Sequence, residues 1–353
     1  MKETLLLKVD PKNPDQAKIE IAAQIIQKGG LVAFPTETVY GLGADALNPD
    51  AVLALFEAKK RPLDNPPIVH VAKASEVYKL VQEVPQKAEL LMKTFWPGPL
   101  TLVFKRSSII PNVTVAGLDT VAIRMPKHKV ALALIKQSSL PIAAPSANLA
   151  GKPSPTTAKH VYEDLNGRID VILDGGPANI GVESTVVDLT VDPPMVLRPG
   201  GTSFEALKKV LGDVKLHPFV QAEEELPLEK IKSPGMKHRH YAPKAEVILV
   251  EGAIAAVTSK IKELSESYRL KGAKVGILAT NETQAIYKAD VVKSLGSRFN
   301  LAVVAQNLFR LLREVDAENV DVIIAEGVSS EGIGLAIMNR LRKASGYHII
   351  KAE

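Results

Sequence analysis

Cysteine is absent from all 353 residues of the chain. This absence excludes disulfide bonds, thiolate nucleophiles and cysteine-ligated metal centres. It is compatible with a reducing cytosol, where disulfides rarely persist. It also fits a heat-adapted source, in which thermolabile residues are scarce.

Long hydrophobic runs are absent as well. No stretch reaches the roughly 18 uninterrupted apolar residues that a membrane-spanning helix needs. The apolar run Leu5–Leu7 is too short for the core of a signal peptide, and charged residues follow it. We therefore expect a cytoplasmic protein that does not contact a membrane.

Three motifs of common phosphate and metal sites are missing: a G-x-x-x-x-G-K-[ST] loop, an H-E-x-x-H pair and an EF-hand loop. GLGADA at 41–46 has two of the three glycines of a dinucleotide fingerprint, but we expect a polar turn after it rather than a long helix. His238 and His240 are close in sequence without an obvious third ligand. We therefore expect no zinc site and identify no metal ligand in the protein.

The remaining composition is typical of a globular protein. Hydrophobic residues make up 46% of the chain and charged residues 24%. The length suits two domains, each with a sizeable core. The net charge of +5 permits binding of polyphosphate or nucleic acid without demanding it.

Short apolar runs alternate with amphipathic helical patterns over residues 1–215, which predicts an α/β domain with a mixed or mostly parallel sheet. The expected strands are Leu31–Phe34, Ile68–Val71, Leu100–Phe104, Thr120–Met125, Ile142–Ala144, Val171–Leu173 and Ser184–Leu189. The expected helices are Asp15–Lys28, Asp50–Lys60, Lys129–Ser138 and Phe204–Leu211.

Residues 216–244 contain four prolines and show no apolar period, so we interpret them as a linker between domains. Residues 245–353 return to a clean alternation, which predicts a small doubly wound, Rossmann-like α/β domain. Its expected strands are Val247–Val250, Lys274–Ala279, Val291–Leu295 and Val320–Ala325, and its expected helices are Ala253–Tyr268, Asn300–Val315 and Gly334–Ala344.

Polar segments follow several predicted strands, where ligands usually bind in open α/β sheets. In FPTETVYGLGADA, 34–46, Gly41 and Gly43 allow backbone amides to approach a ligand, although a tight turn with capping threonines is the alternative. In APSANLAGKPSPT, 144–156, a proline-stiffened loop carries Ser146, Asn148 and Ser154. The alternative for this second segment is an ordinary surface loop.

Cations accompany these segments. Lys59 and Arg61 end a predicted helix and are expected to be surface-accessible, either as a solvated helix cap or as groups that neutralise a triphosphate. Arg124 and Arg198 lie inside apolar strands and need a partner, which is either a structural ion pair or an anionic ligand. Since each arginine comes just before a proline-bearing turn, we favour the ligand.

The predicted pocket is rich in Lys, Arg, Ser, Thr and Asn and has no obvious pair of nucleophile and base. This profile favours nucleotidyl or phosphoryl transfer, in which positioning and charge neutralisation act on a polyanionic substrate. The residues alone do not identify a second substrate.

The ordered set of motifs closely resembles the YrdC-like family of threonylcarbamoyl-AMP synthases in its long two-domain form. The matching pieces are PTETVYGLGADA, Lys59-x-Arg61, FWPGPLT at 95–101, Ser146-x-Asn148, GVESTVVD, LRPGG and SPGMKHRHYAPKA at 233–245. The resemblance covers nearly the whole chain. It implies a twisted open sheet with a concave basic site, a linker that covers this site and a smaller Rossmann-like C-terminal domain.

The resemblance also implies the reaction. L-threonine, bicarbonate or CO2 and ATP give threonylcarbamoyl-AMP and pyrophosphate, with Mg2+ held mainly by the phosphates. The product supports formation of N6-threonylcarbamoyladenosine at position 37 of tRNAs that read ANN codons. Separate downstream proteins transfer the threonylcarbamoyl group, and a direct contact with tRNA or double-stranded RNA is a further expectation.

The residue roles that the resemblance implies fall into three sets. L-threonine is expected to contact Thr38, His70, Arg124, Ala144 and Ser184, with Arg124 at its carboxylate. ATP is expected to contact Arg61, Asn65, Thr120, Ser146, Ser154, Arg198 and, from the linker, Tyr241. The catalytic set is Lys59, Arg61, Ser146 and Asn148, where Lys59 and Arg61 offset the charge of the leaving pyrophosphate.

Two other functions remain open from the sequence. A protein that binds double-stranded RNA or tRNA without catalysis also suits a basic groove, and it would show steeply salt-dependent RNA binding without affinity for ATP. Carbamoyl transfer from carbamoyl phosphate is the third reading, against which the linker and the second domain argue.

Overall fold

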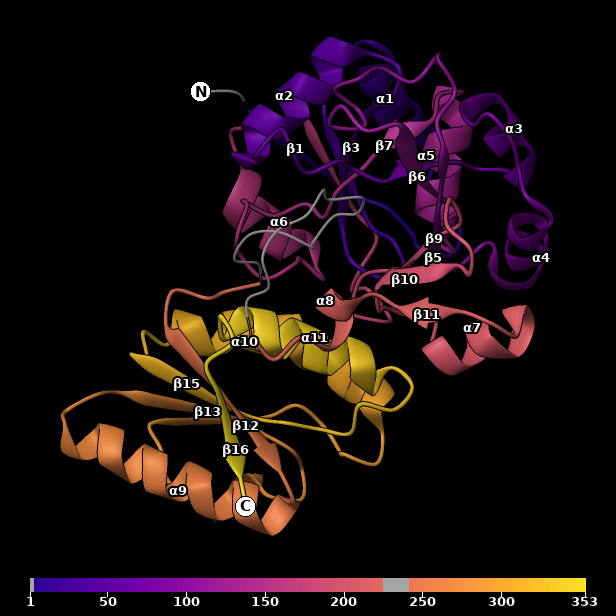
Figure 1. Ribbon diagram of the computed structural model, residues 1–353. Helices are drawn as coiled ribbons and strands as arrows, with labels where there is room; N and C mark the ends of the chain where they lie inside the picture. Colours follow the sequence, from indigo (N-terminus) through magenta and orange to yellow (C-terminus); the bar gives the residue numbers. More distant parts are fainter. Residues whose placement is uncertain (1–2, 225–240) are drawn as a thin grey trace.

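The computed structural model describes residues 3–224 and 241–353. Part of the predicted linker, 225–240 with His238 and His240, lies outside the described residues. The chain forms two α/β units, each built on its own sheet (Figure 1). Within the described ranges, no helix has the length and apolar character needed to cross a bilayer.

The first unit contains an eleven-stranded sheet in the order β1-β8-β2-β3-β7-β4-β6-β5-β9-β10-β11. Parallel pairs such as β5–β9 occur beside antiparallel pairs such as β5–β6, so the predicted mixed sheet is confirmed. The strands are β1 (Leu5–Lys8), β2 (Val32–Phe34), β3 (Gly41–Asp45), β4 (Val69–His70), β5 (Leu100–Lys105), β6 (Thr120–Arg124), β7 (Ile142–Ala143), β8 (Val171–Asp174), β9 (Thr185–Asp188), β10 (Met195–Arg198) and β11 (Lys215–Leu216).

Helices cover both faces of this sheet. Strand β2 shows this, because its successive side chains point to opposite faces and meet helices on each. Val32 and Phe34 pack with α1 and α5, whereas Ala33 packs with α2 and α6. The helices are α1 (Gln16–Gln27), α2 (Pro49–Lys59), η1 (Ala74–Glu76), α3 (Val77–Leu80), α4 (Gln86–Phe95), α5 (Lys129–Ser138), α6 (Ala158–Leu165), α7 (Phe204–Leu211) and α8 (Pro218–Gln221).

The segment around GLGADA differs from the expectation. Gly41–Asp45 forms strand β3, antiparallel to both β2 and β7, which the sequence did not predict; the turn expected after it is present but is followed at once by helix α2. A Cβ on Gly43 would lie 2.8 Å from Cγ2 of Ile142 and 2.9 Å from Cε1 of Phe34. Gly43 therefore permits close packing inside the sheet, which corrects the prediction that it admits a ligand to the backbone.

The second unit is a five-stranded sheet in the order β14-β13-β15-β12-β16, in which every pair is parallel. This confirms the smaller, Rossmann-like C-terminal unit. The strands are β12 (Glu246–Gly252), β13 (Val275–Ala279), β14 (Val291–Ser294), β15 (Val322–Glu326) and β16 (Ile349–Ala352). The helices are α9 (Ile254–Leu270), η2 (Gln284–Ile286), α10 (Leu301–Ala317) and α11 (Gly334–Ala344).

Helices α10 and α11 lie between the two sheets, while α9 covers the far face of the second sheet (Figure 1). Val39 and Val182 of the first unit share a buried apolar cluster with Phe309 of α10. Gly181 has φ +83°, and a Cβ there would lie 2.4 Å from the carbonyl oxygen of Ala305. The backbone of the first unit therefore rests directly against α10.

Candidate active site

A cleft opens in the first unit next to the second, and it measures about 610 Å³ including the solvent at its mouth. It gathers predicted site residues from distant parts of the chain: Thr38, Arg61, His70, Arg124, Ala144, Ser146, Asn148, Ser154, Ser184, Arg198 and Tyr241. The other residues that line it are Thr36, Val39, Gly41, Ile68, Pro145, Lys152 and Glu183. Three predicted residues, Lys59, Asn65 and Thr120, are not part of the lining.

Sheet topology brings these side chains together. His70 on β4 and Arg124 on β6 are register partners in a parallel pair, so both project from the same end of the sheet. Strand β7 is antiparallel to β4, so the 144–156 loop leaves it beside Ile68 and Val69, and Arg198 ends β10. The site therefore lies where strand ends and their following loops converge, the usual location in α/β sheets.

Arg124 is buried and already charge-balanced. Its Nη2 lies 2.7 Å from Oε1 of Glu37, and its Nη1 donates to Oγ1 of Thr38 at 2.9 Å. The structural ion pair that was one alternative is thus present, yet Arg124 also lines the cleft. Glu37 stands beside Thr38 in the quoted TET segment, but its sequence position alone did not reveal which arginine it would meet.

His70 is held as a neutral imidazole. Burial, with a smaller contribution from the charge of Arg124, lowers the pKa of His70 to about 3. Its Nδ1 lies 3.1 Å from the carbonyl oxygen of Ile68. Because a carbonyl oxygen can only accept, Nδ1 carries the proton and Nε2 is left as an acceptor. A donor such as a hydroxyl or ammonium group suits this side chain.

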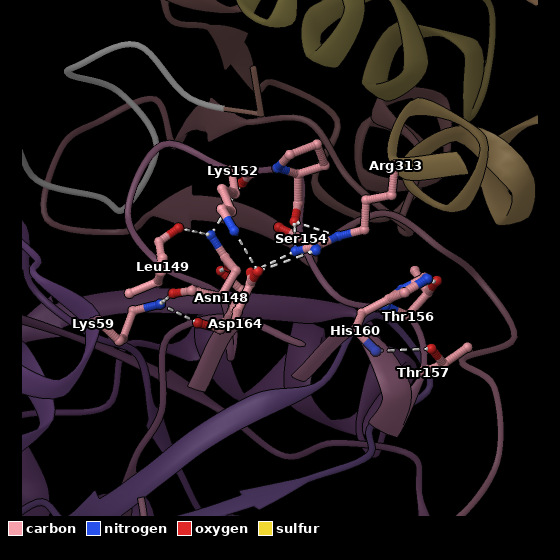
Figure 2. Close-up of polar contacts among 12 residues, drawn as sticks. Lys59, Asn148, Leu149, Lys152, Ser154, Thr156, Thr157, His160, Asp164 and Arg313 are labelled. Carbon is pink, nitrogen blue, oxygen red and sulfur yellow. Dashed lines mark hydrogen bonds and ion pairs between the residues drawn. The ribbon is translucent and has the colours of Figure 1, made fainter. Parts of the chain in front are cut away.

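Lys59 is only 1% exposed, which corrects the expectation that it is surface-accessible. Its Nζ donates to the carbonyl oxygens of Ser146 and Asn148 (Figure 2). Burial lowers the pKa of the Lys59 ammonium well below its usual value. The lysine therefore fastens the backbone of the 144–156 loop to the end of α2.

Arg61 reaches the cleft, and its position is fixed by the chain that follows it. Its Nε donates to the carbonyl oxygen of Asn65 at 2.9 Å. Burial lowers the pKa of Arg61 to about 10, which leaves it charged at neutral pH. Asn65 is 1% exposed and does not line the cleft, so its contact with the site is this bond to Arg61. Thr120 opens β6 opposite Lys105, at the other end of the strand from Arg124.

The 144–156 loop is organised by its own polar groups (Figure 2). The Ser146 hydroxyl donates to Oδ1 of Asn148 at 2.6 Å. Nδ2 of Asn148 donates to the carbonyl oxygens of Leu149 at 2.7 Å and Lys152 at 3.0 Å. Asn148 thus closes a tight turn, and the hydroxyl oxygen of Ser146 keeps its acceptor lone pairs for a ligand.

Arg198 and Ser184 are neighbours in the cleft lining. Arg198 donates from Nε to the Ser184 carbonyl oxygen at 3.1 Å and from Nη2 to the Ser184 hydroxyl at 3.2 Å. That hydroxyl also lies 2.7 Å from Oγ1 of Thr101 on β5. Burial lowers the pKa of Arg198. A fixed guanidinium beside a fixed hydroxyl suits the oxygens of a carboxylate or a phosphate.

Glu183 and Tyr241 connect the cleft to the second unit. Glu183 accepts from Ser154 Oγ at 2.6 Å and from Arg340 Nε at 2.8 Å. Burial raises the pKa of Glu183, but the charges of Arg340 and Arg198 outweigh it and lower the pKa to about 2. The Tyr241 ring stacks on Phe309 at 5.2 Å between centroids. Sequence reasoning missed Glu183, although a carboxylate in the apolar run GVESTVV was a signal for it.

The donor atoms do not fit a resident metal ion. No group of three or more His, Cys, Asp or Glu side chains in the described part of the chain is placed to hold one. Glu183 is the only carboxylate among the described lining residues, and Ser154 and Arg340 occupy it. The cleft is therefore equipped for anions rather than for a bare cation.

Comparison with known proteins agrees with this geometry. The Sua5/YciO/YrdC family model, described as telomere recombination, matches residues 24–200. A second model, described as the threonylcarbamoyl-AMP synthase C-terminal domain, matches residues 202–346.

Relatives match along nearly the full length. A threonylcarbamoyl-AMP synthase of Pyrococcus abyssi is 55% identical over 96% of both chains, and one of Bacillus subtilis is 50% identical over 97% of both. A crystal structure of P. abyssi Sua5 complexed with L-threonine matches with a TM-score of 0.94 and 53% identity, covering 99% of this chain and 100% of that one. The chain belongs to the threonylcarbamoyl-AMP synthase family, in the form that carries both domains.

Proposed function

We propose that this protein condenses L-threonine, bicarbonate or CO2 and ATP to threonylcarbamoyl-AMP and pyrophosphate. One observation carries the proposal: a single cleft brings together Arg61, Arg124 and Arg198 with a neutral histidine and a hydroxyl-rich loop. Fixed cations and hydroxyl groups of this kind stabilise charge on a polyanion without a covalent step. The relatives named above carry the same activity in their names.

Threonine fits the wall formed by Thr38, His70, Arg124, Ala144 and Ser184. Arg124 takes the carboxylate, since its guanidinium is buried and held in orientation by Glu37 and Thr38. Neutral His70 accepts from the hydroxyl or the amino group. The crystallised P. abyssi relative was solved with L-threonine, which supports this assignment.

ATP fits the other wall. Arg61 and Arg198 face its phosphates, while Ser146, Asn148 and Ser154 present the organised loop beside them. Tyr241 closes the cleft against the nucleotide. Asn65 serves this site by holding Arg61, Lys59 serves it by holding the loop, and Thr120 stays a predicted contact.

The proposed chemistry has two steps. The threonine amine attacks the carbon of CO2 and releases a proton to solvent, or attacks bicarbonate and its proton leaves in the departing water; either route gives a carbamate. A carbamate oxygen then attacks the α-phosphorus of ATP, and the bond from that phosphorus to the bridging oxygen breaks as pyrophosphate leaves. Arg61 offsets the charge that develops on the leaving group. No protein nucleophile is required.

Other components of the proposal follow from the reaction. Mg2+ enters as part of the substrate MgATP, since ATP phosphates can supply its ligands. The product is consumed by separate proteins that transfer the threonylcarbamoyl group to adenosine 37 of tRNAs reading ANN codons. The protein acts in the cytoplasm, where tRNA is modified, and its basic charge allows a contact with tRNA.

The test is pyrophosphate release from MgATP with threonine and bicarbonate supplied together or singly. Release that requires both supports the proposal, and release that ignores both refutes it. A parallel titration with tRNA at several salt concentrations addresses the alternative. Steeply salt-dependent RNA binding without any affinity for ATP or threonine would favour a non-catalytic RNA-binding protein.

A further inference from the structure

The side chains of two arginines in the second unit contact residues of the first unit beside the cleft. Arg313 projects from α10, and Arg340 from α11. Their side chains are 11% and 0% exposed. Sequence reasoning assigned no role to either residue, and neither lines the cleft itself. Buried arginines need partners, and the identity of these partners shows what each one does.

Arg313 grips the loop that carries Ser154 (Figure 2). Its Nη2 and Nε donate to the carbonyl oxygen of Pro153 at 2.6 and 3.2 Å. The same Nη2 lies 2.7 Å from Oδ2 of Asp164, and Nη1 lies 3.4 Å from Oδ1. The planar guanidinium thus holds the residue directly before Ser154 and a carboxylate on α6 in one geometry.

Asp164 fixes the orientation of Arg313 through these contacts. Its side chain is 1% exposed and also accepts from Nζ of Lys152 at 2.8 Å. Burial acts to raise the pKa of Asp164, but its contacts with Arg313 and Lys152 outweigh burial and lower the pKa. Asp164 therefore stays ionised at neutral pH and holds Lys152 directly and Pro153 through Arg313, the two residues that precede Ser154.

Arg340 reaches Ser154 from the other side. It donates from Nε to Glu183, whose second oxygen accepts the Ser154 hydroxyl. The Arg340 guanidinium also lies over the Tyr241 ring, 5.4 Å from its centroid. The hydroxyl, the peptide before it and the neighbouring aromatic ring are thus all positioned from the second unit.

We infer that Arg313 and Arg340 are positioning residues for the nucleotide wall, and that the C-terminal unit serves to hold the Ser154 loop in its binding conformation. This inference rests on the proposed function, because it assigns that loop to ATP. Arg124 of the threonine wall is held by Glu37 and Thr38 instead, which belong to the first unit. Loss of Arg313 must therefore act on ATP and leave threonine binding intact.

The experiment compares Arg313→Ala, Arg313→Lys and the control Arg310→Ala in the full-length protein. Arg310 lies one turn earlier on α10, and its described hydrogen bonds go to Glu314 and Asn307 of the same helix. Arg310→Ala therefore removes the same charge from the same helix without touching the loop. Measurements are kcat and KM for ATP at saturating threonine, the Kd of threonine by calorimetry, and the melting temperature.

For Arg313→Ala we expect kcat/KM for ATP to fall about ten- to a hundredfold, because small misplacements of positioning groups cost rates of this order. The Kd of threonine should change by less than about twofold, as for sites that share no partners. Arg313→Lys should recover part of the loss, since lysine supplies a charge without the fork. Arg310→Ala should match the wild type.

The results separate the two levels of the argument. If wild-type protein releases no pyrophosphate with threonine, bicarbonate and MgATP, the proposed function itself is wrong. If the wild type is active and Arg313→Ala equals Arg310→Ala, only the positioning role is refuted. A fall in melting temperature with equal losses of ATP and threonine binding would also refute it. Should Arg313→Ala fail to fold, Arg313→Lys alone must show the selective loss for ATP.

Discussion

Replacing Lys59 by methionine is the sharpest test of how the loop at the cleft is held. Methionine keeps the length and apolar stem of the side chain but removes the ammonium donor. In the wild type that ammonium bonds to the carbonyl oxygens of Ser146 and Asn148, and the group is 1% exposed. The variant therefore leaves the Asn148 carbonyl oxygen without its lysine donor, whereas the Ser146 carbonyl oxygen keeps the bond from the Asn148 backbone N–H at 3.0 Å.

The structure sets the size of the effect. A buried carbonyl left without a donor costs about 1–3 kcal/mol, and here this applies to the carbonyl of Asn148 alone. Removing a buried ammonium also returns part of its own desolvation cost. The free energy of unfolding should fall by a net amount of about 1–2 kcal/mol relative to the wild type.

The measurement is urea unfolding of Lys59→Met beside Lys60→Met, with the rate of pyrophosphate release for each. Lys60 is the next residue and is exposed, so its variant controls for loss of charge at the end of α2. We expect Lys60→Met to keep wild-type stability. If Lys59→Met were equally stable but inactive, the lysine would act directly on the pyrophosphate, as the sequence suggested, and the loop-anchoring argument would fail.

Three further outcomes are expected. Gly181→Ala should lower the free energy of unfolding by about 1–3 kcal/mol more than Gly176→Ala. Both glycines have positive φ, but only a Cβ at 181 would meet the backbone of α10. Equal losses in urea unfolding would contradict this close contact. His70 has a folded-state pKa of about 3, so stability should fall as pH drops from about 6.5 towards 3 by up to about 1.4 kcal/mol per unit, and His70→Gln should flatten that slope. Arg124→Gln should raise the Kd of threonine, measured by calorimetry, about a hundredfold. Adding Glu37→Gln removes the carboxylate left unpaired, so it should restore stability but not threonine binding. Restored binding would exclude Arg124 as the carboxylate ligand.

Local patterns predicted the elements well where one periodicity dominated. The helices α5, α7 and α11 have the predicted bounds, and α1 begins one residue after Asp15, whose side chain caps it. Strand β3 was missed because its two glycines resemble a turn when read locally. Tertiary packing explains at least one of these glycines, because Gly43 lies against Phe34 and Ile142 of the strands on either side. Residue spacing cannot reveal that kind of contact.

The sequence predicted which residues line the candidate site better than it predicted the contacts that these residues make. Motifs identified most of the cleft lining, but they could not state that Lys59 points inward or that Asn65 acts through its carbonyl. Both facts depend on where the chain turns after α2. The contacts across the two units, including those of Glu183 and Arg313, depend on docking of whole domains, which no sequence period encodes.

These contacts bear on how the cleft can open. Interfaces between domains of one chain are commonly polar and permit relative motion. Here the joint combines an apolar cluster with two ion pairs, Arg340–Glu183 and Arg313–Asp164, whose carboxylates are 8% and 1% exposed. Separating a buried pair without hydrating both ions is costly. Withdrawal of α10 and α11 from the first unit would also release the Ser154 loop. A hinge motion at this joint would therefore disrupt the wall that we propose for ATP, which makes such a motion a poor route for substrate entry.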